Sequence, residues 1–305
     1  MNQPRKPPRH RIDGVLLLDK PAGMTSNAAL QKAKWLLNAA KAGHTGTLDP
    51  MATGLLPICF GEATKFAGEL LGADKRYAAT VRLGIRTDTA DAEGLALETH
   101  PVAVTREQVE AVLARFRGDI QQVPPMHSAL KRDGRPLYEY ARKGIELERA
   151  PRAVSIHALD LCAFDADRVD FEVDCSKGTY VRTLAQDIGD ALGCGGHLVS
   201  LRRTRIGNLQ LEDAITLEAL EALPPESRKR LLQPADALLA ALPRLDLDEA
   251  AALRFSHGQV VRAGQDYPAG QCRVYAAEGH FLGLGRAVPD GQVAPARLVA
   301  SVFEK

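Results

Sequence analysis

Residues 43–54 read GHTGTLDPMATG, and a single carboxylate, Asp49, stands in the middle of this stretch. Three glycines and a proline surround it, so the backbone must turn sharply there. The stretch follows a helix-like segment and precedes the apolar run 55–60, which is typical of a buried strand. An acidic side chain held by a glycine-rich loop between regular elements is a common setting for a catalytic group. The loop alone favours a simpler interpretation, an Asx-turn in which Asp49 only caps the turn before Pro50.

Elements on both sides of this loop follow strand and helix patterns. Apolar runs and apolar–polar alternation predict strands at 14–18, 55–60, 77–83, 152–161, 168–175 and 197–205. Helices are expected after Ser26 or Asn27, at 62–71, from a capping box at Thr105 and Gln108 to Gly118, at 137–143, and between Gly178 and Gly193. Because paired strands are mixed with helices, we expect an α+β fold with a mixed or largely antiparallel sheet.

The composition is that of an ordinary globular protein. With 305 residues the chain has room for one large domain and a small one, and glycine-punctuated apolar runs after residue 245 predict a β-rich module. No apolar run approaches the roughly 18 residues of a membrane span, so no membrane partner is expected. The five cysteines are odd in number and form no Cys-x-x-Cys, which indicates a reduced, cytoplasmic protein. Cys194 and His197 have a ligand-like spacing, but without a second pair we expect no metal site.

Charge is distributed locally rather than globally. The net charge is only +1, which argues weakly against a nucleic-acid partner. Residues 1–11 are basic and rich in proline, and we expect a short disordered tail there. The long connection 124–152 holds an excess of basic residues beside two tyrosines, and a second basic cluster follows at 202–205. Such charges are usually solvated, but basic groups beside aromatic rings also suit an RNA-contacting surface.

The stretch 43–54 strongly resembles the signature of the bacterial tRNA pseudouridine synthase B family, which isomerises uridine 55 in the T-loop of tRNA. Further family-like stretches follow in the family's order at 14–21, 74–77, 83–91, 124–131, 137–142, 175–182 and 197–203. The resemblance implies the pseudouridine synthase fold, with a central mixed, mostly antiparallel sheet flanked by helices. It implies a catalytic domain over 12–243 with an inserted thumb loop at 124–152, and a PUA-like RNA-binding domain over 244–305.

The resemblance also assigns catalytic roles. Asp49 matches the catalytic aspartate, Arg182 matches the arginine that pairs with it, and Tyr77 matches the tyrosine that lies against the target base. A cation within ~4–6 Å would lower the pKa of Asp49 by about 1–3 units, which would keep it ionised. The tyrosine ring offers a stacking face and its hydroxyl a group for proton transfer.

Further residues are assigned to substrate binding on the same ground. Tyr180 and Leu201 match positions that line the uracil pocket, and His44 matches a residue that enters the T-loop when the uridine flips out. Lys20 and Lys65 match basic positions with phosphate-binding or structural roles. Lys131, in the expected thumb, is a candidate for RNA contact.

The implied reaction breaks the N1–C1′ glycosidic bond, rotates the base and joins C5 to C1′. No atoms are gained or lost, so neither a metal nor an organic cofactor is expected. A carboxylate can act as nucleophile or general base, and the sequence leaves open whether Asp49 attacks C1′ or C6. The chain contains no lipase, zinc-protease, Walker or dinucleotide-binding motif.

Three alternatives remain open. The first is an RNA-guided relative that works in a ribonucleoprotein, although the short chain and near-neutral charge disfavour it. The second is a non-catalytic factor that folds tRNA. The third is a glycosidase or nucleosidase, which would need two carboxylates across the bond where the signature offers one. The preferred interpretation is a monomeric enzyme acting on the T stem-loop of tRNA.

Overall fold

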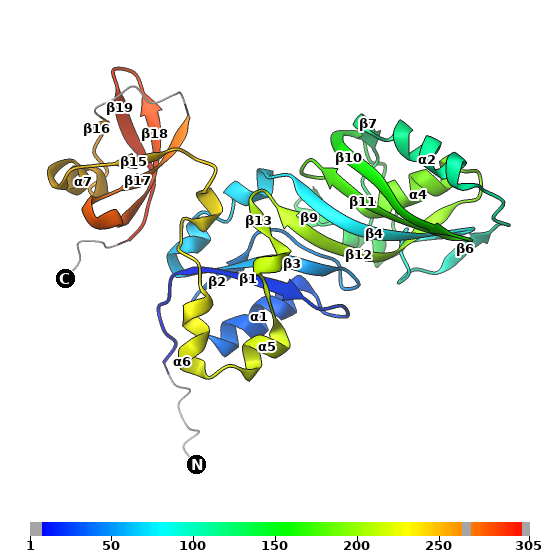
Figure 1. Cartoon of the computed structure of the whole chain (residues 1–305), viewed down its shortest axis with the longest axis horizontal. Coiled ribbons are helices and arrows are strands. Elements are labelled where there is room, and N and C mark those ends of the chain that lie inside the picture. Colours follow the sequence, from blue (N-terminus) through cyan, green and yellow to red (C-terminus); the bar gives the residue numbers. More distant parts are fainter. Residues whose placement is uncertain (1–7, 264–269, 301–305) are drawn as a thin grey trace, which may run out of the picture.

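The computed structural model describes residues 8–263 and 270–300 and contains two main sheets (Figure 1). The larger sheet has ten strands in the order β14-β1-β3-β12-β4-β11-β10-β7, with β2 added beside β3 and β13 beside β12. Its strands are β1 (Gly14–Lys20), β2 (Ala42–His44), β3 (Thr53–Phe60), β4 (Lys75–Leu83), β7 (Gly118–Gln122), β10 (Arg152–Asp165), β11 (Arg168–Cys175), β12 (Gly196–Ile206), β13 (Leu209–Gln210) and β14 (Ile215–Thr216). The β1–β14 and β12–β3 pairs are parallel and the other pairs of this sheet, as far as the structure describes it, are antiparallel. The predicted mixed, mostly antiparallel sheet is therefore confirmed.

Helices pack on this sheet and bury an apolar core. They are α1 (Ser26–Leu36), α2 (Arg106–Arg115), α4 (Val181–Ala191), α5 (Leu217–Ala222) and α6 (Pro225–Arg228). The predicted capping box of α2 is present, because the Thr105 hydroxyl accepts from Gln108 while the Gln108 side chain accepts from the Thr105 backbone. Helix α2 ends at Arg115, before the predicted Gly118, which begins β7.

The cap of α1 differs from the sequence-based expectation. Thr25, rather than Ser26 or Asn27, is the N-cap, and its hydroxyl accepts from the backbone N–H of Ala28 at 3.1 Å. The Ser26 hydroxyl is used elsewhere, since it exchanges two hydrogen bonds with the backbone of Leu48 at 2.8 and 2.9 Å. These bonds tie the start of α1 to the loop that carries Asp49.

The segment 62–71, predicted as one short helix, is instead two 3₁₀ turns, η1 (Gly61–Lys65) and η2 (Glu69–Gly72). Glycine at position 68 separates them, and the backbone bond from Phe66 to Ala63 at 3.0 Å has the tighter 3₁₀ spacing. Phe66 is fully buried, so packing of its ring decides the local geometry over helix propensity. Smaller 3₁₀ turns are η3 (Leu211–Asp213), η4 (Lys229–Leu231), η5 (Ala237–Leu239) and η6 (Ala277–Gly279).

Two hairpins project from the large sheet. One is β5 (Ile85–Thr87) with β6 (Ala96–Thr99), and the other lies within 124–152 as β8 (Lys131–Arg132) with β9 (Arg135–Pro136). The second is followed by α3 (Leu137–Ala141), which is two residues shorter than the predicted 137–143 helix. Gly144 ends that turn with a φ of 70°, a conformation that glycine adopts without strain.

The C-terminal residues form a separate lobe (Figure 1). Its five-stranded sheet contains β15 (Arg244–Asp246), β16 (Val261–Arg262), β17 (Gln271–Tyr275), β18 (Phe281–Val288) and β19 (Gln292–Leu298), beside α7 (Glu249–Ser256). This lobe has an apolar core of its own, which includes Phe255 and Val274, and the predicted β-rich module is confirmed. Phe281 reaches the large domain, where its ring lies 5.4 Å from that of Phe66.

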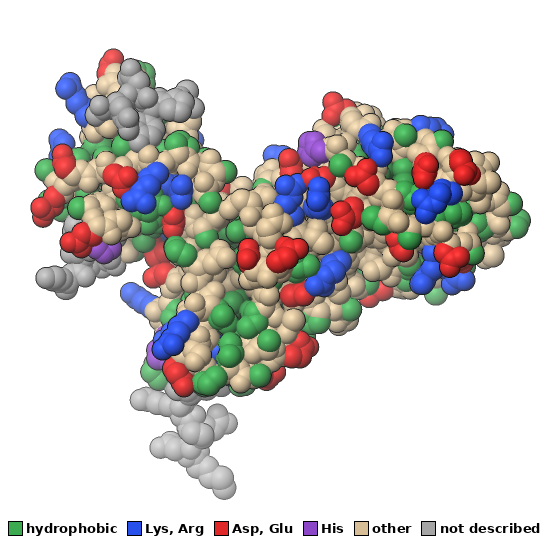
Figure 2. All heavy atoms as spheres, viewed as in Figure 1, with side chains coloured by type: hydrophobic (Ala, Val, Ile, Leu, Met, Phe, Trp, Pro, Cys, Tyr) green, Lys and Arg blue, Asp and Glu red, His purple; other side chains and the backbone are tan. Residues whose placement is uncertain are grey.

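Charged side chains of both signs cover the surface (Figure 2). Figure 2 shows acidic and basic side chains interspersed over both lobes on the face drawn, in keeping with the net charge of +1.

Of the predicted tail 1–11, residues 1–7 lie outside the described residues. His10 is paired, because its backbone N–H donates to Asn38 at 2.8 Å and its carbonyl accepts from Ala40 at 2.9 Å, so residue 10 itself is ordered. Within the described ranges, no helix has the length and apolar character to cross a membrane.

Candidate active site

A cavity of about 770 Å³ opens between the Asp49 loop, the start of α1, the 124–152 segment and the start of α4. Its volume is in the range of pockets that hold a small organic group. Six of the residues assigned by resemblance line it: His44, Asp49, Tyr77, Tyr180, Arg182 and Leu201. They come from separate parts of the chain, and the large sheet and its helices bring them together.

Asp49 and Arg182 form an ion pair in this cavity. Arg182 Nε lies 2.9 Å from Asp49 Oδ2. The arginine side chain is 5% exposed and the aspartate side chain 36%, so the carboxylate faces the cavity while the guanidinium lies behind it. Arg182 is the second residue of α4, and its guanidinium also donates to the carbonyls of Thr89 at 3.3 Å and His127 at 2.8 Å.

A second carboxylate, Asp91, completes this arrangement, and the sequence analysis assigned it no role. Asp91 Oδ2 lies 3.6 Å from Arg182 Nη1, and its side chain is 5% exposed. Its other oxygen accepts from the Thr89 hydroxyl at 2.6 Å and from the Glu93 backbone at 3.1 Å. The signal was its place at the end of the family-like stretch 83–91, but its contact with Arg182 arises only in the folded chain.

Arg182 lowers the pKa of Asp49 as expected, but the net shift of that pKa is upward. Burial of the carboxylate raises the pKa of Asp49 above its ordinary value, and this effect exceeds the opposing effect of the Arg182 cation. The negative charge of Asp91 raises it further, while Lys20 acts with Arg182 to lower it. The expected net depression of the pKa is therefore wrong, although the effect of Arg182 has the expected sign, because a sequence motif does not report how much water the carboxylate loses.

Tyr77 forms another wall of the cavity. It stands on β4 directly opposite Val173 of β11 and Arg203 of β12, and its side chain is almost fully buried. Burial raises the pKa of the Tyr77 phenol, and a hydrogen bond from Arg203 together with its charge opposes that rise. The phenol is therefore neutral at physiological pH, with its ring against the cavity.

His44, Tyr180 and Leu201 contribute different surfaces. His44 Nδ1 accepts from the backbone of Gly46 at 3.4 Å, and burial with the nearby Arg203 charge lowers the pKa of the imidazole, so it is neutral. The backbone of Tyr180 is held by the Gln122 side chain through bonds of 2.8 and 3.1 Å. Leu201 is buried on β12 and presents an apolar face.

Lys20, at the end of β1, braces the loop from behind. It is fully buried, and its ammonium donates to the carbonyls of Pro21 at 2.8 Å, Met24 at 2.6 Å and Pro50 at 3.3 Å. Burial lowers the pKa of Lys20 to about 8, although the Asp49 charge opposes this. Its three donors are occupied, so of the two roles implied for this position the structure favours the structural one over phosphate binding.

The other two lysines lie outside the cavity lining. Lys65 pairs with Glu62 at 2.6 Å and donates to the Leu298 carbonyl at 2.9 Å, so it joins η1 to the C-terminal sheet. Lys131 is exposed on β8 of the thumb segment. An RNA would have to extend beyond the cavity to reach either of them.

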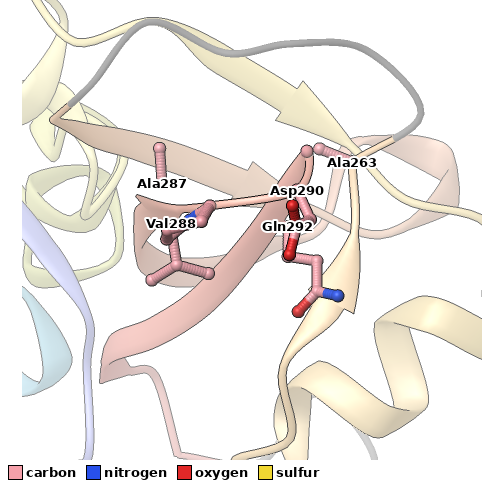
Figure 3. A pocket seen from close by; sticks show the side chains of 7 residues that line it. Ala263, Ala287, Val288, Asp290 and Gln292 are labelled. Atoms are coloured by element: carbon pink, nitrogen blue, oxygen red, sulfur yellow. The ribbon is translucent and has the colours of Figure 1, made fainter.

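Other parts of the molecule offer less chemistry. A hollow of about 240 Å³ lies at the turn between β18 and β19, and Figure 3 shows Ala263, Ala287, Val288, Asp290 and Gln292 around it. Among the described residues that line it, Asp290 alone has an ionisable side chain. Throughout residues 8–263 and 270–300, no group of three or more His, Cys, Asp or Glu side chains is arranged to hold a metal ion.

Comparison with known proteins identifies the family. Residues 34–181 match the family described as TruB family pseudouridylate synthase (N terminal domain). The chain belongs to this family. Residues 182–240 match the tRNA pseudouridylate synthase B C-terminal domain, and residues 243–299 match the pseudouridine synthase II TruB C-terminal region. The pseudouridylate synthase match ends one residue before Arg182, so the cavity draws on the first two matched regions.

Curated relatives extend this likeness over nearly the whole chain. It is similar to the tRNA pseudouridine synthase B of Aromatoleum aromaticum, with 62% identity over 294 residues that cover 96% of this chain and 95% of that protein. It is also similar to the tRNA pseudouridine synthase B of Ralstonia pickettii, with 59% identity covering 97% of both chains.

Solved structures show the same fold. A chain in the crystal structure of a Cbf5-Nop10-Gar1 complex has 29% identity and a TM-score of 0.70, covering 90% of this chain and 78% of that one. A chain of the archaeal box H/ACA sRNP Nop10-Cbf5 complex has 26% identity and a TM-score of 0.71, covering 94% and 85%. The predicted pseudouridine synthase fold is therefore confirmed.

Proposed function

We propose that the cavity around Asp49 isomerises uridine to pseudouridine at position 55 in the T-loop of tRNA. The observation that carries this proposal is the Asp49–Arg182 pair, 2.9 Å apart, with the carboxylate facing a cavity walled by Tyr77. The tRNA pseudouridine synthase B relatives support the choice of tRNA as substrate. Of the two carboxylates that contact Arg182, Asp49 is the more exposed, at 36% against 5% for Asp91, so Asp49 is the one available to a base in the cavity.

The target uridine must leave its stack to reach Asp49. Flipping costs a few kcal/mol, which contacts inside the cavity must offset. The ring of Tyr77 offers a stacking face worth about 1–3 kcal/mol, and Leu201 supplies apolar contact on the same side. His44, neutral at the rim, is the group proposed to occupy the space that the flipped base leaves in the T-loop.

Asp49 must be ionised to act as a nucleophile or base. Its raised pKa makes the carboxylate more basic than an ordinary aspartate, while the charge of Arg182 opposes that rise and favours the ionised form. The active carboxylate is lost as the pH falls through this raised pKa. The acid limb of the rate profile should therefore lie above the ordinary range of an aspartate.

We propose that the chain acts as a monomer in the cytoplasm, without metal or organic cofactor, and grips the T stem-loop with the thumb segment 124–152. The exposed Lys131, Arg132 and Arg135 provide cations for the RNA backbone. The C-terminal sheet is a second candidate for RNA contact, by its match to the family's C-terminal region.

One experiment tests the function directly. The purified protein is incubated with an unmodified tRNA transcript, without any guide RNA, and pseudouridine is mapped at each nucleotide. We expect product at position 55 alone. Product only when a guide RNA is added would favour the RNA-guided alternative, which the tRNA pseudouridine synthase B relatives do not favour. Improved tRNA folding without any pseudouridine would favour the folding factor.

A further inference from the structure

Arg203 is a buried cation beneath the cavity, on β12. Its side chain is 1% exposed, which makes it one of the most deeply buried groups of the large domain. Among the residues that the structure describes, no carboxylate pairs with it; its side chain donates to two backbone carbonyls, and Tyr77 stands directly opposite it across β12 and β4. Burying an arginine without a carboxylate partner is costly, and an apolar side chain would fill the same space at less cost. Its presence therefore needs a reason beyond packing.

The contacts of Arg203 join three parts of the site. Its Nε donates to the Leu55 carbonyl of β3 at 2.8 Å, and its Nη2 donates to the Gly46 carbonyl at 3.2 Å. Gly46 belongs to the loop that carries Asp49. On the other side, Arg203 stands directly opposite Tyr77 in the register of β12 with β4. One guanidinium thus holds the catalytic loop, the strand after it and the tyrosine in a common frame.

The backbone around Arg203 is closely fitted. Gly54 is its register partner on β3 and has a φ of 99°. A Cβ at position 54 would lie 2.3 Å from the Arg203 carbonyl oxygen, so only glycine allows this approach of the two strands. The backbone of Arg203 is therefore fixed closely against β3, while its side chain is held by its own hydrogen bonds.

The direction of the hydrogen bond to Tyr77 follows from chemistry. A guanidinium only donates, so the Tyr77 oxygen must accept, and the phenol proton is left to point elsewhere. The titratable groups that face the phenol are Arg203 from β12, Cys175 from β11 and Asp49 from the loop. Of these, only Asp49 lines the cavity, so a bond donated by Arg203 to the Tyr77 oxygen leaves the phenol proton free to point toward the cavity.

We propose that Arg203 is a positioning residue that orients the Tyr77 hydroxyl for proton transfer at the target base. Arg203 does not line the cavity and acts through Tyr77, with the same side chain holding the Gly46 backbone in place. This inference rests on the proposed function, because it presumes that the Tyr77 hydroxyl takes part in the isomerisation.

A double-mutant cycle tests the link between the two residues. Single-turnover rates are measured for Arg203→Lys, Tyr77→Phe and the double variant on a T-loop substrate. Arg203→Lys keeps a charged donor but loses the fixed geometry of the guanidinium, so it should slow the reaction by about 10-fold, the lower end of the factor for losing a hydrogen bond to a charged group. In the Tyr77→Phe background the same change should slow the reaction by a clearly smaller factor, because the hydroxyl is absent and only the bonds to the Leu55 and Gly46 carbonyls remain to be disturbed. Independent, multiplying effects would overturn the proposal.

A spectroscopic measurement tests the contact without using activity. The protein is labelled with carbon-13 at tyrosine Cζ, and the Tyr77 resonance is identified by its loss in Tyr77→Phe. Arg203→Met should move this resonance, and Arg203→Lys should restore it in part because a charged donor remains. An unmoved resonance in a folded Arg203→Met protein would overturn the proposal. If Arg203→Met does not fold, the Arg203→Lys cycle decides alone.

Arg228 offers a matched control. It also donates to several backbone carbonyls, among them those of Leu36 at 2.8 Å and Leu223 at 3.0 Å, but it lies outside the cavity lining. Arg228→Lys should lower the free energy of unfolding without moving the Tyr77 resonance. Its effect on the single-turnover rate should be the same with tyrosine or phenylalanine at position 77. The outcomes also separate two failures. No pseudouridine from the unaltered protein would refute the proposed function, whereas a moved resonance with no coupling in the cycle would refute only the role of Arg203.

Discussion

The Asp49 loop and the thumb segment 124–152 line the same cavity but are held in opposite ways. The loop is anchored from behind by buried side chains, with Lys20, Ser26 and Arg203 all bonded to its backbone. In the thumb, Lys131, Arg132 and Arg135 are exposed, and the hydrogen bonds of the segment lie mostly within it, such as the one from Leu137 to the Leu130 carbonyl at 2.7 Å. This difference indicates that the Asp49 loop serves the chemical step, which needs fixed geometry. The thumb segment serves RNA binding, which needs accessible positive charge.

The two regions meet at one arginine. Arg182 holds Asp49 through its Nε and donates to the His127 carbonyl at the base of the thumb. A movement of the backbone at His127 would therefore shift Arg182 and change its contact with Asp49. Substitution of Asp49 in the loop should abolish turnover. Removal of the thumb cations should weaken tRNA binding and leave the rate of the chemical step unchanged.

The largest expected effect is that of Asp49→Asn. The amide keeps the shape but cannot act as nucleophile or base, so isomerisation should fall to a trace while tRNA binding stays near that of the unaltered protein. Single-turnover assays and equilibrium binding measure the two properties. Asp160→Asn is the control, because Asp160 is exposed on β10, and it should retain full activity. Clear turnover by Asp49→Asn would remove Asp49 from the catalytic role.

Tyr77→Phe should have the next largest effect. The ring remains to hold the uracil while the hydroxyl is lost, so affinity should be preserved and the rate should fall by roughly the 10²–10⁴-fold typical of a general acid or base. Tyr77→Leu should also lose stacking and bind more weakly. Single-turnover kinetics separate chemistry from product release. An unchanged rate for Tyr77→Phe would leave Tyr77 as a stacking surface only.

Asp91→Asn probes the carboxylate that the sequence analysis missed. Losing this buried partner of Arg182 should lower the free energy of unfolding by about 3–5 kcal/mol, measured by denaturant titration. Because the Asp91 charge raises the pKa of Asp49, its removal should move the acid limb of the rate profile to lower pH. A limb that stays in place or moves to higher pH would contradict this electrostatic coupling.

A smaller effect is expected from the thumb. Changing Lys131, Arg132 and Arg135 to alanine should weaken tRNA binding and flatten its salt dependence, by about 0.7 in slope for each phosphate that the variant no longer binds. The single-turnover rate at saturation should change little, because these side chains lie outside the cavity lining. A matched triple alanine variant at Arg106, Arg115 and Arg117 removes the same charge from the α2 side. Equal weakening of binding in both variants would mean that only total charge matters.

The smallest effect should come from removing metal. The reaction has no electron or atom to exchange, so activity should survive EDTA and exhaustive dialysis in simple salt. The check is the initial rate before and after treatment, with the fold of the tRNA monitored separately. Loss of activity that a single divalent ion restores, on tRNA that stays folded, would count against a cofactor-free mechanism.

Much of the fold could be predicted from local patterns. The alternation at 168–175 predicted β11 with the bounds that the structure has, and the capping box at Thr105 and Gln108 predicted the start of α2. Where the prediction was wrong, tertiary contacts competed with local preference. Burial of Phe66 divided the expected 62–71 helix, and the bonding of Ser26 to Leu48 moved the α1 cap to Thr25.

The sequence alone determined which residues could take part in the chemistry, since Asp49, Tyr77 and Arg182 stand in motifs whose order along the chain carries the family resemblance. Only the tertiary structure decided what surrounds them. The raised pKa of Asp49 and the place of Asp91 behind Arg182 depend on groups far apart in the chain. Desolvation and charge coupling act through space, and a linear pattern records neither the water that a group loses nor the charge that folding brings beside it.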